Sequence, residues 1–301
     1  MYQYTNNDRI SLVDPRKAHP RPPFKNQRRL ELPASIAEMN PQPDHGESSY
    51  VGNGKLRGLT ALITGGDSGI GRAIALAYAR EGAQVVINYF QSRDDADSIV
   101  ELIQEAETEA IAFQGDLRKE SICEKLIERT IRHFGTLDIL INNAAYQQTE
   151  DELEEFSTQV FDQIFKTNVY APFWLSRAAL PKMTAGGSII NTVSIQAYAP
   201  SPELLPYAAS KSALLGLTKG LAKLAIEYGV RVNAVAPGPV WTPLIPATVD
   251  LSKTKNFGGN TLLKRPAQPV ELAPLYVWLA SPEASYVTGE VFGATGGRTP
   301  F

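Results

Sequence analysis

The sequence predicts a doubly wound α/β fold with a seven-stranded parallel sheet. From Leu59 onward, seven short apolar runs are separated mostly by segments of helical periodicity. Six of these runs are rich in β-branched residues without a clean alternation of polar and apolar positions, which is typical of strands buried on both faces. Proline and polar residues become sparser near Lys55, so we expect an extended arm over 1–55 and a folded domain over 56–301.

The arm is identified by its composition. The stretches "HPRPPFKNQRRLELPAS" and "MNPQPDHGESS" combine many proline and polar residues with few apolar residues at regular spacing. Such segments do not build a core of their own. We therefore expect the arm either to be disordered or to lie across a surface, such as that of a neighbouring subunit, and both alternatives remain open.

Strands and helices alternate through the folded domain. The predicted strands cover residues 60–64, 83–89, 110–116, 137–145, 187–194, 230–237 and 286–296. An apolar stripe predicts a helix over 72–81 that ends at Gly82. Ser92 is placed to cap the next helix, whose first turn carries two carboxylates. A long apolar-striped helix is expected over 207–229.

Bulk composition narrows the classes of function. A net charge of −3 argues against a nucleic-acid partner, and the absence of a long apolar run argues against a membrane span. The single cysteine, Cys123, and an N-terminus without signal-peptide features favour a cytoplasmic protein. Because the three histidines, His19, His45 and His133, lie far apart, we expect no metal site.

The stretch "ALITGGDSGIGRA" (61–73) fits two kinds of site. Its Gly-Asp-Ser-Gly core resembles the nucleophile loop of trypsin-like serine proteases, but the upstream histidines lie in the arm and the surrounding fold is α/β. The same stretch joins a strand to a helix. In that context Gly65, Gly69 and Gly71 let backbone N–H groups approach a pyrophosphate at a helix N-terminus. We therefore predict a dinucleotide site.

A tyrosine and a lysine mark the candidate catalytic centre. Of the twelve tyrosines, only Tyr207 is followed by lysine four residues later, at Lys211. On a helix this spacing places both side chains on one face, and a nearby cation lowers the pKa of a phenol. Ser194 follows a predicted buried strand at the carboxyl edge of the sheet, where open α/β sheets bind ligands.

Several motifs in order resemble those of the short-chain dehydrogenase/reductase family. "TGGDSGIG" (64–71) is similar to its cofactor loop, Asp116-Leu117 to its adenine contact, and "NNAA" (142–145) to its fourth-strand motif, with Ala145 where the family usually has glycine. Asn168 in "FKTNVY" matches the helix asparagine, and "PGPVWTP" (237–243) the loop over the nicotinamide. The closer resemblance is to bacterial general-stress oxidoreductases and plant glucose/ribitol dehydrogenase homologues, which carry a Pro-rich N-terminal extension.

The resemblance implies a Rossmann-type catalytic domain, a homotetramer, and hydride transfer between NADP(H) or NAD(H) and a small carbonyl or alcohol. Tyr207 is implied as proton donor or acceptor, Ser194 as hydrogen-bond donor to the substrate oxygen, Lys211 as ribose contact, and Asn168 as anchor of a water. The implied cofactor-binding residues are Gly65, Asp67, Ser68, Gly69, Ile70, Gly71, Asn88, Tyr89, Asp116, Leu117, Asn143, Ala144, Tyr207, Lys211, Pro237, Gly238, Val240 and Thr242. The C-terminal "GATGGRTPF" would lie near a subunit interface.

Substrate recognition is less defined by the sequence. The segment 244–266 has the Gly, Pro and polar content of a mobile lid. The candidate substrate contacts are Gln147, Gln148, Gln196, Tyr198 and Trp241. These amide, phenol and indole groups suit a small polar carbonyl or a polyol.

The choice of coenzyme depends on the end of the second strand. The edge Asn88–Gln91 carries no carboxylate to repel a 2′-phosphate, and Arg93 is close in sequence, which favours NADP(H) over NAD(H). Two alternatives to a small-carbonyl reductase remain: a 3-oxoacyl thioester reductase and a non-catalytic dinucleotide sensor on the same fold. The intact catalytic set argues against the sensor.

Overall fold

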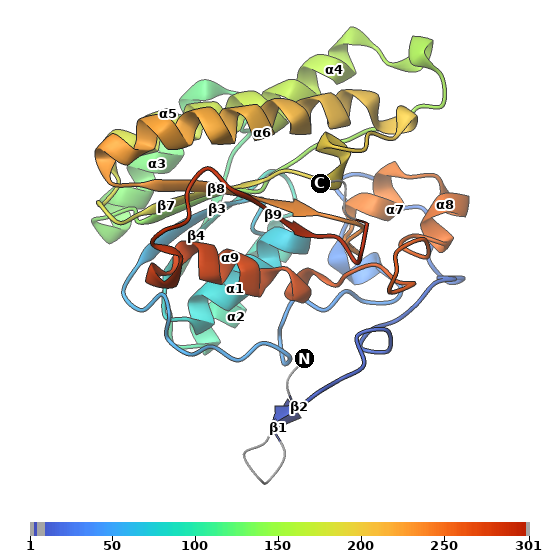
Figure 1. The fold of residues 1–301 in the computed structure, drawn as a ribbon, viewed down its shortest axis with the longest axis horizontal. Helices are drawn as coiled ribbons and strands as arrows, with labels where there is room; N and C mark the ends of the chain where they lie inside the picture. The colour runs from blue at the N-terminus through green and yellow to red at the C-terminus, as the bar shows by residue number, and fades with distance from the viewer. Residues whose placement is uncertain (1–2, 5–9, 299–301) are drawn as a thin grey trace.

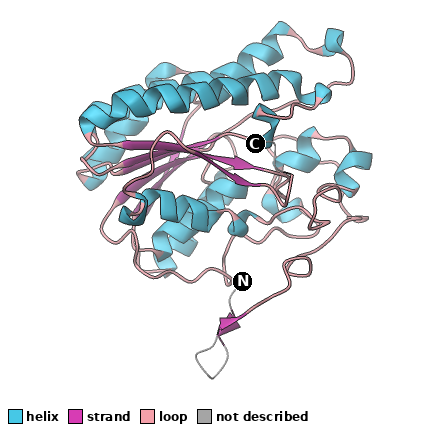
Figure 2. Ribbon diagram, viewed as in Figure 1, coloured by secondary structure: helices cyan, strands magenta, loops and turns pink. Residues whose placement is uncertain are grey.

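The computed structural model describes residues 3–4 and 10–298 of the 301-residue chain. In this part of the chain seven parallel strands form one sheet in the order β5-β4-β3-β6-β7-β8-β9, with helices on both faces (Figures 1 and 2). The predicted doubly wound fold is confirmed. Residues 1–2 and 5–9 of the expected arm, and 299–301 of the expected domain and interface segment, lie outside the described residues.

The strands of the sheet are short, and those inside the sheet are almost entirely buried, whereas the two edge strands are only partly buried. Their bounds are Thr60–Thr64 (β3), Gln84–Tyr89 (β4), Ala110–Gln114 (β5), Ile139–Asn142 (β6), Ser188–Thr192 (β7), Arg231–Pro237 (β8) and Val291–Ala294 (β9). A small antiparallel pair that the sequence did not predict joins Gln3–Tyr4 (β1) to Ile10–Ser11 (β2). Strand order reverses beside β3, which pairs with both β4 and β6, and such a reversal opens a crevice at the carboxyl ends of the strands.

The helices form two layers. Along the chain they are Gly69–Arg80 (α1), Arg93–Glu105 (α2), Glu120–Phe134 (α3), Thr158–Phe165 (α4), Ala171–Ala179 (α5), Leu205–Ala225 (α6), Leu244–Thr248 (α7), Leu251–Lys255 (α8) and Ala273–Ala280 (α9). In Figure 1, α3 to α6 lie on one side of the sheet and α1, α2 and α9 on the other, while α7 and α8 stand at its edge. A π-helical turn, Lys166–Tyr170, joins α4 to α5.

Helix ends follow the sequence signals only in part. Gly82, after α1, has the positive φ of 88° that was expected of a residue following a helix. The predicted cap at Ser92 is wrong in one respect: Ser92 is the N-cap residue of α2, but among the described residues its side chain accepts no capping hydrogen bond. It lines a cleft instead.

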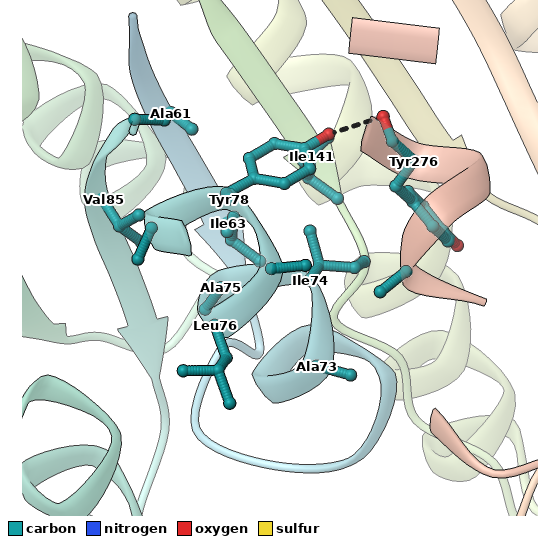
Figure 3. Close-up of a cluster of buried hydrophobic side chains, with 14 of the residues drawn as sticks. Ala61, Ile63, Ala73, Ile74, Ala75, Leu76, Tyr78, Val85, Ile141 and Tyr276 are labelled. Atoms are coloured by element: carbon teal, nitrogen blue, oxygen red, sulfur yellow. Dashed lines mark hydrogen bonds between the residues drawn. The ribbon is translucent and has the colours of Figure 1, made fainter. Parts of the chain in front are cut away.

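The core beneath the sheet is tied to the cleft by two tyrosines. Tyr78 of α1 and Tyr276 of α9 lie among Ile63, Ile74 and neighbouring apolar side chains (Figure 3). The Tyr78 hydroxyl donates to the Tyr276 carbonyl at 2.9 Å, and the Tyr276 and Thr192 hydroxyls are 2.8 Å apart. Thr192, the last residue of β7, is thereby fixed from below.

The arm lies across the surface of its own chain. Phe24, Leu30 and Met39 pack with Trp241 and with Ile245 of α7 in a separate apolar cluster. The indole Nε1 of Trp241 donates to the carbonyl of Pro41 at 2.8 Å. Of the two alternatives, the described part of the arm therefore follows the docked one, and the surface it covers is the segment expected to be a lid.

Candidate active site

A cleft of about 630 Å³ opens at the carboxyl edge of the sheet. Most of the residues that the sequence predicts to be catalytic or to bind the cofactor line this cleft. Those in its wall are Gly65, Asp67, Ser68, Gly69, Ile70, Asn88, Asp116, Leu117, Asn143, Ala144, Ser194, Tyr207, Lys211, Pro237, Gly238, Val240 and Thr242. The fold thus brings together seven segments, most of them loops, that are separate in the sequence.

Three of the residues expected to be catalytic or to bind the cofactor lie outside this wall. Tyr89 is 6% exposed and packs in the core cluster under the sheet. Gly71 lies in the first turn of α1, where a Cβ would come within 1.9 Å of the Gly65 carbonyl oxygen. Asn168, fully buried in the π-helical turn, donates to the Tyr146 carbonyl and to Ser210 Oγ, both at 2.9 Å, and accepts from the Tyr146 N–H at 2.8 Å. These three residues shape the cleft from behind.

The glycine loop is fixed against β6. The Asn143 side chain donates to the carbonyl of Thr64 at 3.0 Å, and the Thr64 hydroxyl accepts from the backbone N–H groups of Asn143 and Ala144. Gly65 and Gly69 have φ of 61° and 52°, a backbone region that favours glycine. A glycine backbone at the start of α1 leaves room for phosphate oxygens beside the free N–H groups of the helix.

Helix α6 carries the candidate catalytic pair, Tyr207 and Lys211. The Lys211 Nζ is 5.5 Å from the centre of the Tyr207 ring and donates to the Thr192 carbonyl at 2.7 Å. Ser194, 8% exposed, follows β7 and accepts from the Gln196 N–H at 3.2 Å. The same Thr192 that is fixed by Tyr276 therefore positions the ammonium group of Lys211.

The charge states of the pair differ from the sequence prediction. Burial raises the pKa of Tyr207 to about 12, and a hydrogen bond with Ser194 acts in the opposite direction. Burial also lowers the pKa of Lys211 to about 7. The lowering of the Tyr207 pKa predicted from Lys211 is therefore not seen in this structure, where burial is the largest influence. Removal from water favours the neutral form of both groups, and the Lys211 Nζ donates its hydrogen bond to the Thr192 carbonyl.

This arrangement predicts a pH-dependent stability cost at Lys211. Between pH 7 and 10.5 the unfolded chain binds a proton there that the folded protein does not hold, so the free energy of unfolding should rise with pH by about 1 kcal/mol per unit. Lys211→Met removes this slope. Urea denaturation at pH 7 and pH 9 should show wild type gaining stability relative to Lys211→Met, whereas Lys219→Met, on an exposed part of α6, should follow wild type. An unchanged gap would contradict the depressed Lys211 pKa.

The opposite end of the cleft is built around β4 and β5. The Asn88 side chain donates to the carbonyls of Phe113 and Gly115, both at 3.2 Å. The Arg118 guanidinium lies 5.3 Å from the centre of the Phe90 ring and pairs with both oxygens of Asp116 at 2.8 Å. Phe90 and Arg118 line the cleft but were not singled out from the sequence. The position of Arg118, two residues after Asp116, was the available signal.

Two charged side chains, Arg93 and Asp67, bear on how the β4 and β5 end of the cleft would bind a coenzyme. Arg93 lies outside the cleft wall, is exposed and pairs with Asp97 one turn further along α2 at 3.3 Å, so the predicted contact with a 2′-phosphate is not supported. Asp67 does line the cleft. Burial raises its pKa to about 7, the nearby Asp95 adds to the rise, and Arg72 opposes it.

The expected substrate contacts are divided. Gln147 and Gln196 line the cleft, and the Gln147 amide donates to Thr248 Oγ1 at 2.8 Å. Gln148 and Tyr198 lie outside its wall. The prediction for Trp241 is wrong, because this side chain is fully buried under the arm, with the Phe24 ring centre 4.4 Å from its own.

The arm and the C-terminal segment also reach the cleft, which the sequence did not indicate. Leu32, Pro33 and Ala34 of the arm and Arg298 near the C-terminus are in its wall. In the described ranges, no group of three or more His, Cys, Asp or Glu side chains is arranged to hold a metal. Within the same ranges no helix has the length and apolar character needed to cross a membrane.

Comparisons with known proteins agree with this geometry. A family model described as "Enoyl-(Acyl carrier protein) reductase" matches residues 65–299. The chain is 42% identical to NADPH-dependent aldehyde reductase 1 of Arabidopsis thaliana, over 91% of this chain and 97% of the relative. It is 40% identical to glucose and ribitol dehydrogenase of Daucus carota, over 91% and 96%.

A solved structure of a short-chain dehydrogenase has a similar fold. The short-chain dehydrogenase of Burkholderia cenocepacia, crystallised with NADP, superposes with a TM-score of 0.77 at 32% identity, covering 81% of this chain and 98% of that one.

Proposed function

Since this chain belongs to the short-chain dehydrogenase/reductase family of NAD(P)-dependent oxidoreductases, we propose that it interconverts a small carbonyl compound and its alcohol with Tyr207 as the acid–base group. The observation that carries the proposal is the meeting of Ser194, Tyr207 and Lys211 in one cleft with the glycine loop. A binding protein without catalysis would have no use for a buried phenol beside this loop. This arrangement argues against the sensor alternative.

The cleft fits a dinucleotide. Positive φ angles at Gly65 and Gly69 keep side chains out of the space next to the start of α1, and Asn143 holds this backbone in place. When bound, the nicotinamide ring supplies or accepts the hydride. Lys211 is placed to hold a ribose hydroxyl beside Tyr207.

The protein side chains handle the proton. With its pKa raised to about 12, Tyr207 is a neutral phenol at physiological pH and has a proton to donate to a carbonyl oxygen. Ser194 supplies a second hydrogen bond to that oxygen as negative charge develops on it. The side-chain bonds of Asn168 to Tyr146 and Ser210 favour a positioning role behind the cleft over the water-anchoring role implied by the resemblance.

The cleft and the relatives support two candidate classes of substrate. Small aldehydes, ketones, sugars or polyols are supported by the polar Gln147 and Gln196 in the cleft and by the names of the relatives from Arabidopsis and carrot. A 3-oxoacyl thioester reductase is the second candidate, favoured by the description of the matching family model. A panel of aldehydes, diketones, sugars, polyols and acetoacetyl thioesters separates them. Turnover of the thioesters alone would overturn the first class.

We further propose that NADP(H) is the preferred coenzyme. The residues that β4 and the turn after it contribute to the cleft, Asn88, Phe90, Gln91 and Ser92, include no carboxylate. Of the two carboxylates nearby, Asp116 is paired with Arg118, and burial raises the pKa of Asp67 to about 7. The NADPH dependence in the name of the Arabidopsis relative and the NADP complex of the Burkholderia structure support the same choice. Initial rates at equal subsaturating coenzyme should be about tenfold higher with NADPH. A preference for NADH would contradict the proposal.

Assembly and location complete the proposal. A homotetramer of chains, each with an arm over 1–55 and a catalytic domain over 56–301, is the state implied by the resemblance. A buried free cysteine, Cys123, suits the cytoplasm. Light scattering on the purified protein should return the mass of four chains, and a monomer or dimer would contradict this assembly.

A further inference from the structure

The arm forms part of the cleft wall. Leu32, Pro33 and Ala34 line the same cavity as the glycine-loop residue Ser68 and the β4-end residue Ser92. Leu32 remains 48% exposed, so it contributes to the cleft without being needed for the core. A segment placed in this way can contact whatever occupies the cleft.

One end of this segment is attached to the lid helices. The Leu30 N–H donates to the Pro246 carbonyl in α7 at 3.0 Å, and the Phe24 N–H to the Lys255 carbonyl in α8 at 2.8 Å. Phe24 is 5% exposed and packs on Trp241. Backbone hydrogen bonds and apolar packing thus hold the arm against α7 and α8.

The other end is attached beside the glycine loop. The Ile36 N–H points at the Asp95 carboxylate at 3.4 Å, in the first turn of α2. Further along the arm, Glu47 lies 3.5 Å from Arg72, the residue directly after Gly71, and Arg72 in turn donates to the Asp95 carbonyl at 3.1 Å. The arm therefore spans from the lid to the loop that receives the phosphates.

We propose that residues 30–36 form a strap that closes the dinucleotide cleft and retains the bound coenzyme. This inference rests on the proposed function. The strap is fixed to α7 at Leu30 and to α2 at Ile36. The residues between these two attachments therefore cross from one side of the cleft to the other. A dinucleotide held beneath Leu32–Ala34 leaves only when one attachment opens, and such gating steps slow ligand release.

The test measures coenzyme release by the full-length protein. NADPH is bound to the enzyme, an excess of NADP⁺ is mixed in, and the loss of bound NADPH fluorescence gives the dissociation rate. Leu32→Ala removes a contact in the cleft, and Phe24→Ala weakens the attachment to the lid. Both should release NADPH about three- to tenfold faster than wild type. Leu12→Ala, at an arm leucine that is 92% exposed and outside the cleft wall, is the matched control and should release it at the wild-type rate.

The outcomes separate the two proposals. Wild-type release rates in both Leu32→Ala and Phe24→Ala would overturn the strap and leave the proposed function intact. Acceleration in Phe24→Ala alone would also overturn it, because a loosened lid would then explain the effect. Failure of the wild-type protein to bind either NADPH or NADH would instead overturn the proposed function. Since Leu32 is half-exposed, its variant is expected to fold, and a thermal melt verifies this.

Discussion

Replacing Tyr207 with phenylalanine is expected to lower kcat for carbonyl reduction by about 10²- to 10⁴-fold, the usual contribution of a positioned acid–base group. The substitution removes the Tyr207 hydroxyl, which hydrogen-bonds with Ser194 in the cleft. It leaves the ring in place, so the packing around Lys211 is kept. The Kd for NADPH should change by less than about threefold, which would assign the loss to the chemical step.

The control for this result is another tyrosine. Tyr286→Phe alters a side chain that is fully exposed and outside the cleft wall, and it should have wild-type kcat. Steady-state rates with a responsive aldehyde or diketone, together with fluorescence titration of NADPH, give both quantities. A Tyr207→Phe enzyme with undiminished kcat would end the assignment of Tyr207 as proton donor.

The second large effect is expected for Gly71→Ala. The added Cβ would lie 1.9 Å from the Gly65 carbonyl oxygen and 2.6 Å from Asn143 Nδ2, so the start of α1 must move away from the loop. Overpacking against backbone costs about 1–3 kcal/mol. Because the strain falls on the loop proposed to bind the phosphates, we expect the NADPH Kd to rise by about 10- to 100-fold.

Gly220→Ala provides the matched comparison. Its Cβ would meet no described atom within 4 Å, and the residue lies within α6, where alanine is favoured over glycine by about 0.5–1 kcal/mol. Urea denaturation should therefore show a lower free energy of unfolding for Gly71→Ala and a higher one for Gly220→Ala. NADPH titration should show a changed Kd only for Gly71→Ala. Normal NADPH affinity in Gly71→Ala would contradict the role given to the close packing of this loop.

Local sequence patterns correctly predicted the elements that are surrounded only by apolar side chains. Strand β3 has the predicted bounds, Thr60–Thr64, because a buried parallel strand needs only apolar neighbours on each side. The run at 137–145 overshoots β6 by three residues, since Asn143, Ala144 and Ala145 leave the sheet to line the cleft. Apolar composition alone does not separate these two environments.

Predictions failed where a partner comes from a distant segment. Trp241 follows a strand end at the cleft edge, and nothing near it in the sequence shows that Phe24 and Pro41 cover it. Helical spacing placed Lys211 beside Tyr207 correctly, but it could not show that the Nζ bonds to Thr192 or that burial dominates the pKa of both groups. Arg93 was chosen by proximity in sequence, whereas α2 directs it toward Asp97.

The docked arm also constrains the order in which the chain folds. Trp241 and Pro41 are 200 residues apart, and the hydrogen bond from Arg29 to the Val249 carbonyl spans 220 residues. Contacts of such long range carry a high loop-closure entropy and form slowly. During synthesis the arm emerges before the domain on which it docks, and it cannot reach its place until the sheet is nearly complete and α7 has left the ribosome. The described part of the arm is thus made before the domain but fixed after it.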